Sequence, residues 1–178
     1  AGKSTLLLSL TGLLPLERGR VVFNGLELNR ANAAAFRRGI GLVTQNPDDQ
    51  LFMSTVYDDI AFGPRCQNTA EARIQTKADE VMAALGITAL RDRLTHRLSG
   101  GEKRLAALAG ILVMEPAVML LDEPATFLDE PGRRRLLEIL LSLPQAMIIA
   151  THDHELAEHL CGRTLRLEQG RIMAENPP

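Results

Sequence analysis

Segments that are apolar at almost every position alternate along this chain with stretches of helix-forming residues. Residues 117–121 and 146–150 are the clearest apolar segments, and 39–44 and 164–168 have a similar character. A strand that is apolar on both of its faces is buried on both, as in a parallel sheet covered by helices. The alternation therefore predicts an α/β fold with a mostly parallel sheet and helices on both of its faces.

The segments between these strands carry the signals of helices. Residues 69–85 have apolar side chains at helical spacing and are followed by Gly86, a common helix stop. From about residue 51 to 98 the alternation is interrupted by helix alone, which predicts a small α-helical subdomain inserted into a single domain spanning 1–178. The further elements that we expect are helices at 6–14, 33–38, 101–114, 131–142 and 153–161 and a strand at 19–25.

Composition argues against several other classes of protein. The 20 basic and 22 acidic residues give a formal net charge of −2, so the charge balance predicts no nucleic-acid partner. Cys66 and Cys161 lie far apart and form no metal-binding pattern, which argues against a zinc site. The longest apolar stretch, 105–114, is about half as long as a membrane-spanning helix. We therefore expect no such helix in the chain.

The chain begins with AGKST, which matches the end of the phosphate-binding loop GxxxxGK[ST]. In such a loop the backbone N–H groups, here those of Gly2 to Thr5, surround phosphates at the N-terminus of a helix. Lys3 is expected to pair with the β- and γ-phosphates, and Ser4 to offer its hydroxyl to Mg²⁺. GKST also recurs by chance, so this motif alone leaves a purely structural interpretation open.

Two adjacent carboxylates follow an apolar strand. Asp122 and Glu123 come directly after 117–121, and in nucleotide-hydrolysing sheets the carboxyl end of a strand opens onto the ligand. Asp122 is expected to hold Mg²⁺ through water, and Glu123 to take a proton from the attacking water. The alternative is a strand that ends in a charged turn, which is disfavoured by the presence of GKST in the same chain.

A second candidate anion site precedes the helix expected at 101–114. Ser99, Gly100 and Gly101 stand about twenty residues before the acidic strand end, and adjacent glycines at a helix start expose backbone N–H groups. Alone, this segment is equally well explained as a serine N-cap.

The order of these motifs makes the set specific. Along the chain come GKST, Gln45, LSGGE, LLDEP, Leu128 with Asp129, and Thr151 with His152 and Asp153. In this order and spacing the sequence resembles the ATP-binding-cassette (ABC) transporter family over essentially the whole chain. The resemblance implies a P-loop NTPase core with ATP and Mg²⁺ as cofactors. It also implies that Gln45 ligates Mg²⁺ and senses the γ-phosphate, and that His152 contacts the γ-phosphate. A lone histidine is more often structural, but this one follows the strand at 146–150.

Members of this family work as head-to-tail dimers, in which ATP lies between the phosphate loop of one subunit and the LSGG segment of the other. The resemblance thus assigns Ser99, Gly100 and Gly101 to the nucleotide of a second ATPase subunit, identical or different, and places Asp129 at the dimer interface. Phe127 departs from the pattern, because a small residue is usual there. A bulky side chain at this position is expected to alter the dimer interface.

The stretch from Gln45 to Pro64, QNPDDQLF followed by TVYDDIAFGP, resembles the energy-coupling-factor branch, whose ATPases drive uptake of cobalt, nickel and B-vitamins. The resemblance implies an integral membrane partner and a peripheral position at the cytoplasmic face of the cell membrane. Leu51, Phe52 and Met53 are apolar residues in a polar loop. They either anchor the helical subdomain or accept a coupling helix of the membrane partner.

The phosphate-loop motif is entered partway, and the first residue is Ala1 and not methionine. We therefore expect the N-terminus to be a cut within the loop, with the preceding strand and the family's adenine-stacking aromatic missing. We expect the chain as it stands to bind ATP poorly and to lack measurable ATPase activity, and restoring the native N-terminus to recover it. Two other functions stay open: a non-transport ABC ATPase acting on DNA or the ribosome, and a non-hydrolysing partner subunit.

Overall fold

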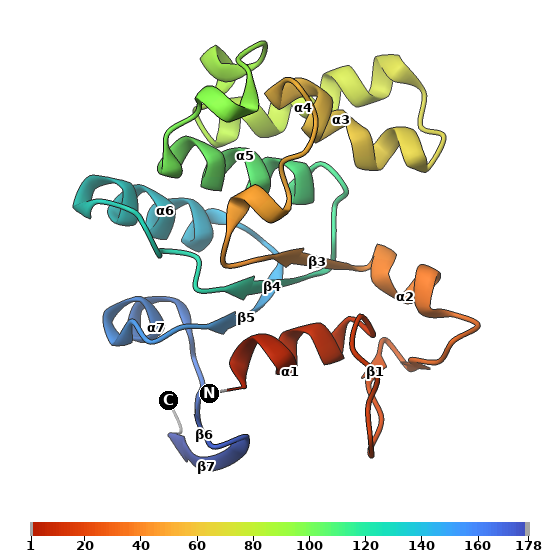
Figure 1. Cartoon of the computed structure of the whole chain (residues 1–178), viewed down its shortest axis with the longest axis vertical. Helices are drawn as coiled ribbons and strands as arrows, with labels where there is room; N and C mark the ends of the chain where they lie inside the picture. The colour runs from red at the N-terminus through yellow and green to blue at the C-terminus, as the bar shows by residue number, and fades with distance from the viewer. Residues whose placement is uncertain (1, 177–178) are drawn as a thin grey trace.

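A three-stranded parallel sheet lies at the centre of the fold, within residues 2–176 that the computed structural model describes (Figure 1). Its strands are β3 (Ile40–Val43), β4 (Val118–Asp122) and β5 (Ala146–Ala150), in that order across the sheet. The register aligns their carboxyl ends, with Val43 opposite Leu121 and Asp122 opposite Ala150. The predicted α/β class with a parallel sheet is confirmed.

The central strand is buried on both faces, as its apolar sequence predicts. Met119 and Leu121 join one core cluster, which includes residues of α5 (Gly100–Leu112), whereas Leu120 joins a second cluster with Leu7 of α1 (Lys3–Leu10). Helices α5 and α1 therefore cover opposite faces of the sheet (Figure 1). Helix α6 (Glu130–Ser142) follows β4, and α7 (His154–Leu160) follows β5.

Helix α5 packs closely against β3. A Cβ atom added to Gly41 of β3 would lie 2.3 Å from Cγ2 of Ile111, so only glycine permits this approach. Between β3 and β4 the chain is helical, as expected from the sequence. This segment contains α3 (Val56–Cys66), α4 (Glu71–Ala84) and the short 3-10 helices η1 (Pro47–Asp49), η2 (Thr88–Leu90) and η3 (Thr95–Arg97). Figure 1 shows α3 and α4 stacked on the far side of α5 from the sheet.

Two short antiparallel hairpins differ from the prediction. The strand expected at 19–25 is only β1 (Val22–Phe23), which pairs with β2 (Leu26–Glu27). Strand β6 (Thr164–Glu168) pairs with β7 (Arg171–Asn176) and does not join the parallel sheet. Each hairpin turns through two residues with positive φ, Asn-Gly at 24–25 and Gln-Gly at 169–170, as tight hairpin turns require.

The first helix begins and ends earlier than the predicted range 6–14, whereas α2 (Ala33–Arg38) matches its prediction. Helix α1 ends at Leu10 because Gly12 takes a φ of 70°, and a Cβ there would lie 2.9 Å from Cδ2 of Leu28. Leu13 is consequently 56% exposed, which contradicts a buried helix over 6–14. None of the helices among the described residues is both long enough and apolar enough to span a membrane.

Candidate functional site

A cavity of about 560 Å³ lies where β3 and β4 end, beside the first turn of α1. Its lining includes Ser4, Gln45 and Asp122, which are the three residues predicted to hold a metal, together with Phe127. These residues come together because parallel strands present their carboxyl ends at one edge of the sheet and α1 begins there. The structure thus brings these three residues together from positions far apart in the sequence.

Asp122 has a buried side chain with an unsatisfied oxygen. The residue is 7% exposed, and its Oδ1 atom has no hydrogen-bond partner among the described residues. A buried carboxylate oxygen is costly unless a cation or donor reaches it. Within residues 2–176 no three His, Cys, Asp or Glu side chains are grouped to hold a metal. The hydroxyl, amide and carboxylate oxygens at this cavity fit Mg²⁺, which typically takes few protein ligands and completes its shell with phosphate and water oxygens.

The start of α1 is suited to an anion. Gly2 precedes the helix with a φ of 104°, a left-handed conformation that glycine adopts readily, and it has no side chain that could cap the helix. The backbone N–H groups of Lys3, Ser4 and Thr5 have no carbonyl one turn earlier within the helix to pair with. These groups and the positive end of the helix dipole favour phosphate at this point.

Glu123 is held beside this site by an unusual backbone conformation. Its φ is 46°, in the left-handed region, and its N–H donates to the carbonyl oxygen of Ala150 at 2.7 Å. Such strain in a non-glycine residue persists only where the surrounding structure enforces it, and it is concentrated at functional sites. The turn directs the carboxylate away from the end of β4 toward the loop after β5.

Three side chains gather on the Glu123 carboxylate. Nζ of Lys3 lies 2.6 Å from Oε1, while Nδ1 of His152 and Oγ1 of Thr151 lie 2.8 and 3.2 Å from Oε2. Burial alone raises the pKa of Glu123, but the contacts with Lys3 and His152 outweigh it and lower the pKa below the ordinary value. Glu123 is therefore ionised at neutral pH and able to accept a proton.

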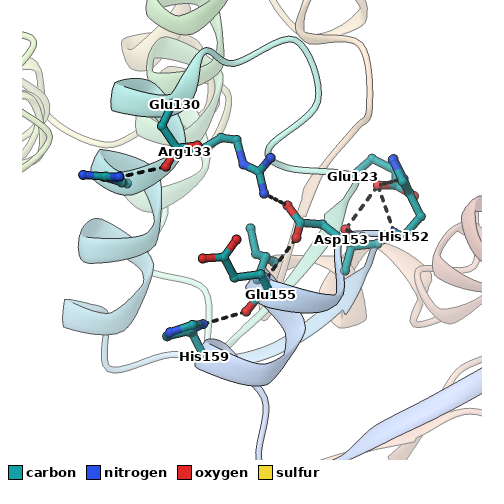
Figure 2. A network of polar contacts seen from close by, with 10 residues as sticks. Glu123, Glu130, Arg133, His152, Asp153, Glu155 and His159 are labelled. Carbon is teal, nitrogen blue, oxygen red and sulfur yellow. Dashed lines mark hydrogen bonds and ion pairs between the residues drawn. The ribbon is translucent and has the colours of Figure 1, made fainter.

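A further ion pair fixes the loop that carries His152 (Figure 2). The Asp153 carboxylate pairs with Arg133 of α6 and also accepts a hydrogen bond from the N–H of Leu156, which makes Asp153 the N-cap of α7. The N–H of Asp153 donates to Oγ1 of Thr151. The loop after β5 is thus tied both to α6 and to its own helix, while the His152 side chain stays 79% exposed.

The other predicted binding residues lie elsewhere. Ser99 is the N-cap of α5 in a capping box: its hydroxyl accepts from the N–H of Glu102 at 3.3 Å, and its own N–H donates to the Glu102 carboxylate at 2.7 Å. Asp129 caps α6 by accepting from the N–H of Gly132 at 3.0 Å. Within the described residues, the lining of the cavity includes none of Ser99, Gly100, Gly101 and Asp129.

Sequence reasoning missed a buried arginine. Arg104 of α5 is 2% exposed, and its guanidinium donates to the backbone oxygens of Thr44 and Gln45. Burial lowers the pKa of Arg104, and the charge of Asp122 partly offsets this effect. The only sequence signal was a pair of basic residues, Lys103 and Arg104, directly before an apolar helical run. Such a pair ordinarily indicates a solvated helix end.

The chain is similar in sequence to proteins of one family. The family profile described as "ABC transporter" matches residues 1–126. The Cobalt import ATP-binding protein CbiO of Rhodobacter capsulatus is 46% identical over 98% of this chain and 64% of its own length. The Energy-coupling factor transporter ATP-binding protein EcfA of Carboxydothermus hydrogenoformans is 43% identical over 98% of this chain and 66% of its own length.

A solved structure has the same fold. CbiO1 of Clostridium perfringens, described as part of the ABC transporter complex cbiONQ, superposes with a TM-score of 0.88 at 37% identity, covering 98% of this chain and 72% of that one. The chain thus spans about two thirds of the length of these relatives.

Proposed function

Because this chain belongs to the ABC transporter family, whose members are ATPases that bind ATP, we propose that it hydrolyses Mg²⁺-bound ATP to power an importer. The observation that carries the proposal is that two features lie at one edge of the sheet. The first is the cavity lined by Ser4, Gln45 and Asp122, and the second is the ionised Glu123, which accepts a hydrogen bond from Lys3. Together they offer a phosphate and metal site next to a proton acceptor.

The proposed roles follow from the chemistry of each side chain. Lys3 and the N–H groups of Gly2 to Thr5 bind the β- and γ-phosphates. Ser4, Gln45 and Asp122 hold Mg²⁺, which, when bound, supplies positive charge to the phosphates. Glu123 accepts a proton from the attacking water at a carboxylate oxygen. His152 contacts the γ-phosphate with its exposed ring.

Nζ of Lys3 donates to the Glu123 carboxylate at 2.6 Å, so a phosphate bound by Lys3 would compete with that carboxylate for one ammonium group. When Lys3 moves to the phosphates, Glu123 loses the cation that most strongly lowers its pKa. Its pKa then rises, and the carboxylate becomes a stronger base at the moment when the substrate is in place. Binding and activation are thus linked through one lysine.

We further propose that the chain acts as a dimer of ATPase subunits, identical or different. The support is that Ser99, Gly100 and Gly101 lie outside the cavity that Ser4 lines, although they begin a helix in which the N–H groups of Gly100 and Gly101 have no helix carbonyl to pair with. Such a segment is available to the nucleotide of a second subunit. Asp129, at the start of α6, is then at the interface between the two.

An integral membrane subunit is the second proposed partner, which makes the chain a peripheral subunit at the cytoplasmic face of the membrane. Phe52 is 64% exposed and packs edge-to-face on Phe62 at 4.7 Å between ring centres. The Asp59 carboxylate accepts hydrogen bonds from the N–H groups of Phe52 and Met53 and fixes this loop. Leu51 packs against the core, so it serves as the anchor, while the exposed aromatic pair is available to a partner.

The names of two relatives, a cobalt import ATP-binding protein and an energy-coupling factor transporter ATP-binding protein, support the energy-coupling-factor branch and uptake of cobalt. Nickel and a vitamin are the alternative substrates that the sequence resemblance implies. The proposed inserted helical subdomain spans about residues 51–98 of a single domain. The test of the proposal is ATP turnover by the full-length protein, alone and with its membrane subunit. We expect Mg²⁺-dependent phosphate release and stimulation by the partner. Absence of phosphate release in both preparations would favour a non-hydrolysing subunit, and stimulation by DNA or ribosomes instead would favour a non-transport ATPase.

A further inference from the structure

Arg104 is a charged side chain at a buried position of α5. It lies in the second turn of α5, and the buried residues that follow it in the helix include Ala106, Ala107 and Leu108. Replacing a buried charge by a well-packed apolar side chain is often neutral or stabilising. The presence of arginine at this position therefore calls for a reason beyond packing.

Both hydrogen bonds of Arg104 go to the loop that carries Gln45. Nη1 donates to the backbone oxygen of Thr44 at 2.6 Å, and Nη2 donates to that of Gln45 itself. The neighbouring Lys103 pairs with Asp48 of η1 at 2.6 Å, so α5 holds the same loop at a second point. The first turns of α5 and the backbone around Gln45 are thus fixed to one another.

This attachment begins one helical turn from the glycine pair. Gly101 and Arg104 are three residues apart in α5, and a helix turn transmits displacement as a rigid element. A Cβ atom added to Gly101 would lie 3.5 Å from Cδ2 of Leu128, in the loop that follows Glu123, so the backbone of Gly101 is next to this side chain. The N-terminus of α5 therefore contacts the loop after Glu123 and, through Arg104, the loop of Gln45.

We propose that Arg104 is a positioning residue that holds the Gln45 backbone to α5, so that the position of the Ser99–Gly101 segment sets the position of Gln45 in the metal site. The inference rests on the proposed function, because that function assigns the Ser99–Gly101 segment to the nucleotide of a second subunit. A second subunit that engages the segment then adjusts Gln45 in the first subunit through Arg104.

The test compares Arg104→Met and Arg104→Lys with Arg135→Met as a matched control. Arg135 also donates to two backbone oxygens, those of Leu85 and Gly86 at 2.7 and 2.9 Å, but it links α6 to the end of α4. In the nucleotide-free, full-length protein we expect amide hydrogens of residues 44–50 to exchange about tenfold faster in Arg104→Met. Arg104→Lys keeps the charge but has fewer donors, so its exchange rate at these residues should lie between those of wild type and Arg104→Met. Arg135→Met should leave the exchange rate of residues 44–50 unchanged.

The second readout is the rise in melting temperature given by ATP, first in EDTA and then in Mg²⁺. In EDTA, we expect ATP to raise the melting temperature of the Arg104 variants as much as that of wild type. Adding Mg²⁺ should raise it further, and the Mg²⁺ concentration that gives half of this further increase should be about tenfold higher in the variants. An unchanged Mg²⁺ requirement together with unchanged exchange at 44–50 would overturn the inference. If Arg104→Met does not fold, Arg104→Lys decides alone. Failure of wild type to be stabilised by ATP would instead refute the proposed function.

Discussion

Replacing Glu123 by glutamine should make the protein bind ATP more tightly while it loses turnover. The reason is the competition for Lys3, whose ammonium lies 2.6 Å from a Glu123 side chain that is only 10% exposed. A hydrogen bond to a charged group contributes about 1.5–3 kcal/mol. Because the Lys3 side chain is 32% exposed, solvent screening reduces this contribution, and we take about 1 kcal/mol. Releasing that interaction corresponds to roughly fivefold tighter binding.

The assay is calorimetric titration of ATP into the full-length protein in EDTA, where binding is separated from Mg²⁺ and from hydrolysis. Glu71→Gln is the matched control, because it removes a carboxylate that pairs with Arg65 at 2.7 Å, on α4 and away from the site. Glu71→Gln should bind ATP like wild type. Equal or weaker ATP binding by Glu123→Gln would refute the competition for Lys3.

Three other changes test separate parts of the account. Lys3 and His152 lower the pKa of Glu123, so ionised Glu123 stabilises the fold above about pH 4.3 and this contribution is lost as the pH falls through the lowered pKa. Lys3→Met should move that loss to higher pH in unfolding curves between about pH 3 and 6, and an identical pH profile would contradict the ion pair. Phe127 has a φ of 66° and is 78% exposed, so Phe127→Gly should raise the free energy of unfolding by about 0.5–1 kcal/mol, whereas a decrease in urea denaturation would argue against strain there. Phe52→Ser removes the contact with Phe62, so it should lower the melting temperature by only a few degrees and weaken co-purification with the membrane subunit; undiminished co-purification would remove Phe52 from that interface.

The sequence was most informative where a segment has one clear hydrophobic pattern. The apolar runs at 117–121 and 146–150 predicted β4 and β5, and their order predicted that Asp122 and Glu123 would face a ligand at the sheet edge. The two hairpins were missed in part because β1 and β2 have two residues each, too few to show alternation. The Asn-Gly turn between them was nevertheless a readable signal.

Contacts between distant segments were the least predictable part of the site. Lys3 and Glu123 are 120 residues apart, and nothing local to either residue indicates an ion pair between them. The burial of Arg104 likewise depends on how closely α5 packs on β3, which Gly41 permits. The capping box of Ser99 and Glu102, by contrast, follows a local spacing that the sequence displays.

The proposed function depends most directly on Glu123 as the proton acceptor for ATP hydrolysis. Phosphate release by the full-length protein with Mg²⁺ and saturating ATP, wild type against Glu123→Gln, measures this role. We predict that turnover falls by about 10²–10⁴-fold while bound ATP is retained. Turnover by Glu123→Gln within a few-fold of wild type would contradict it.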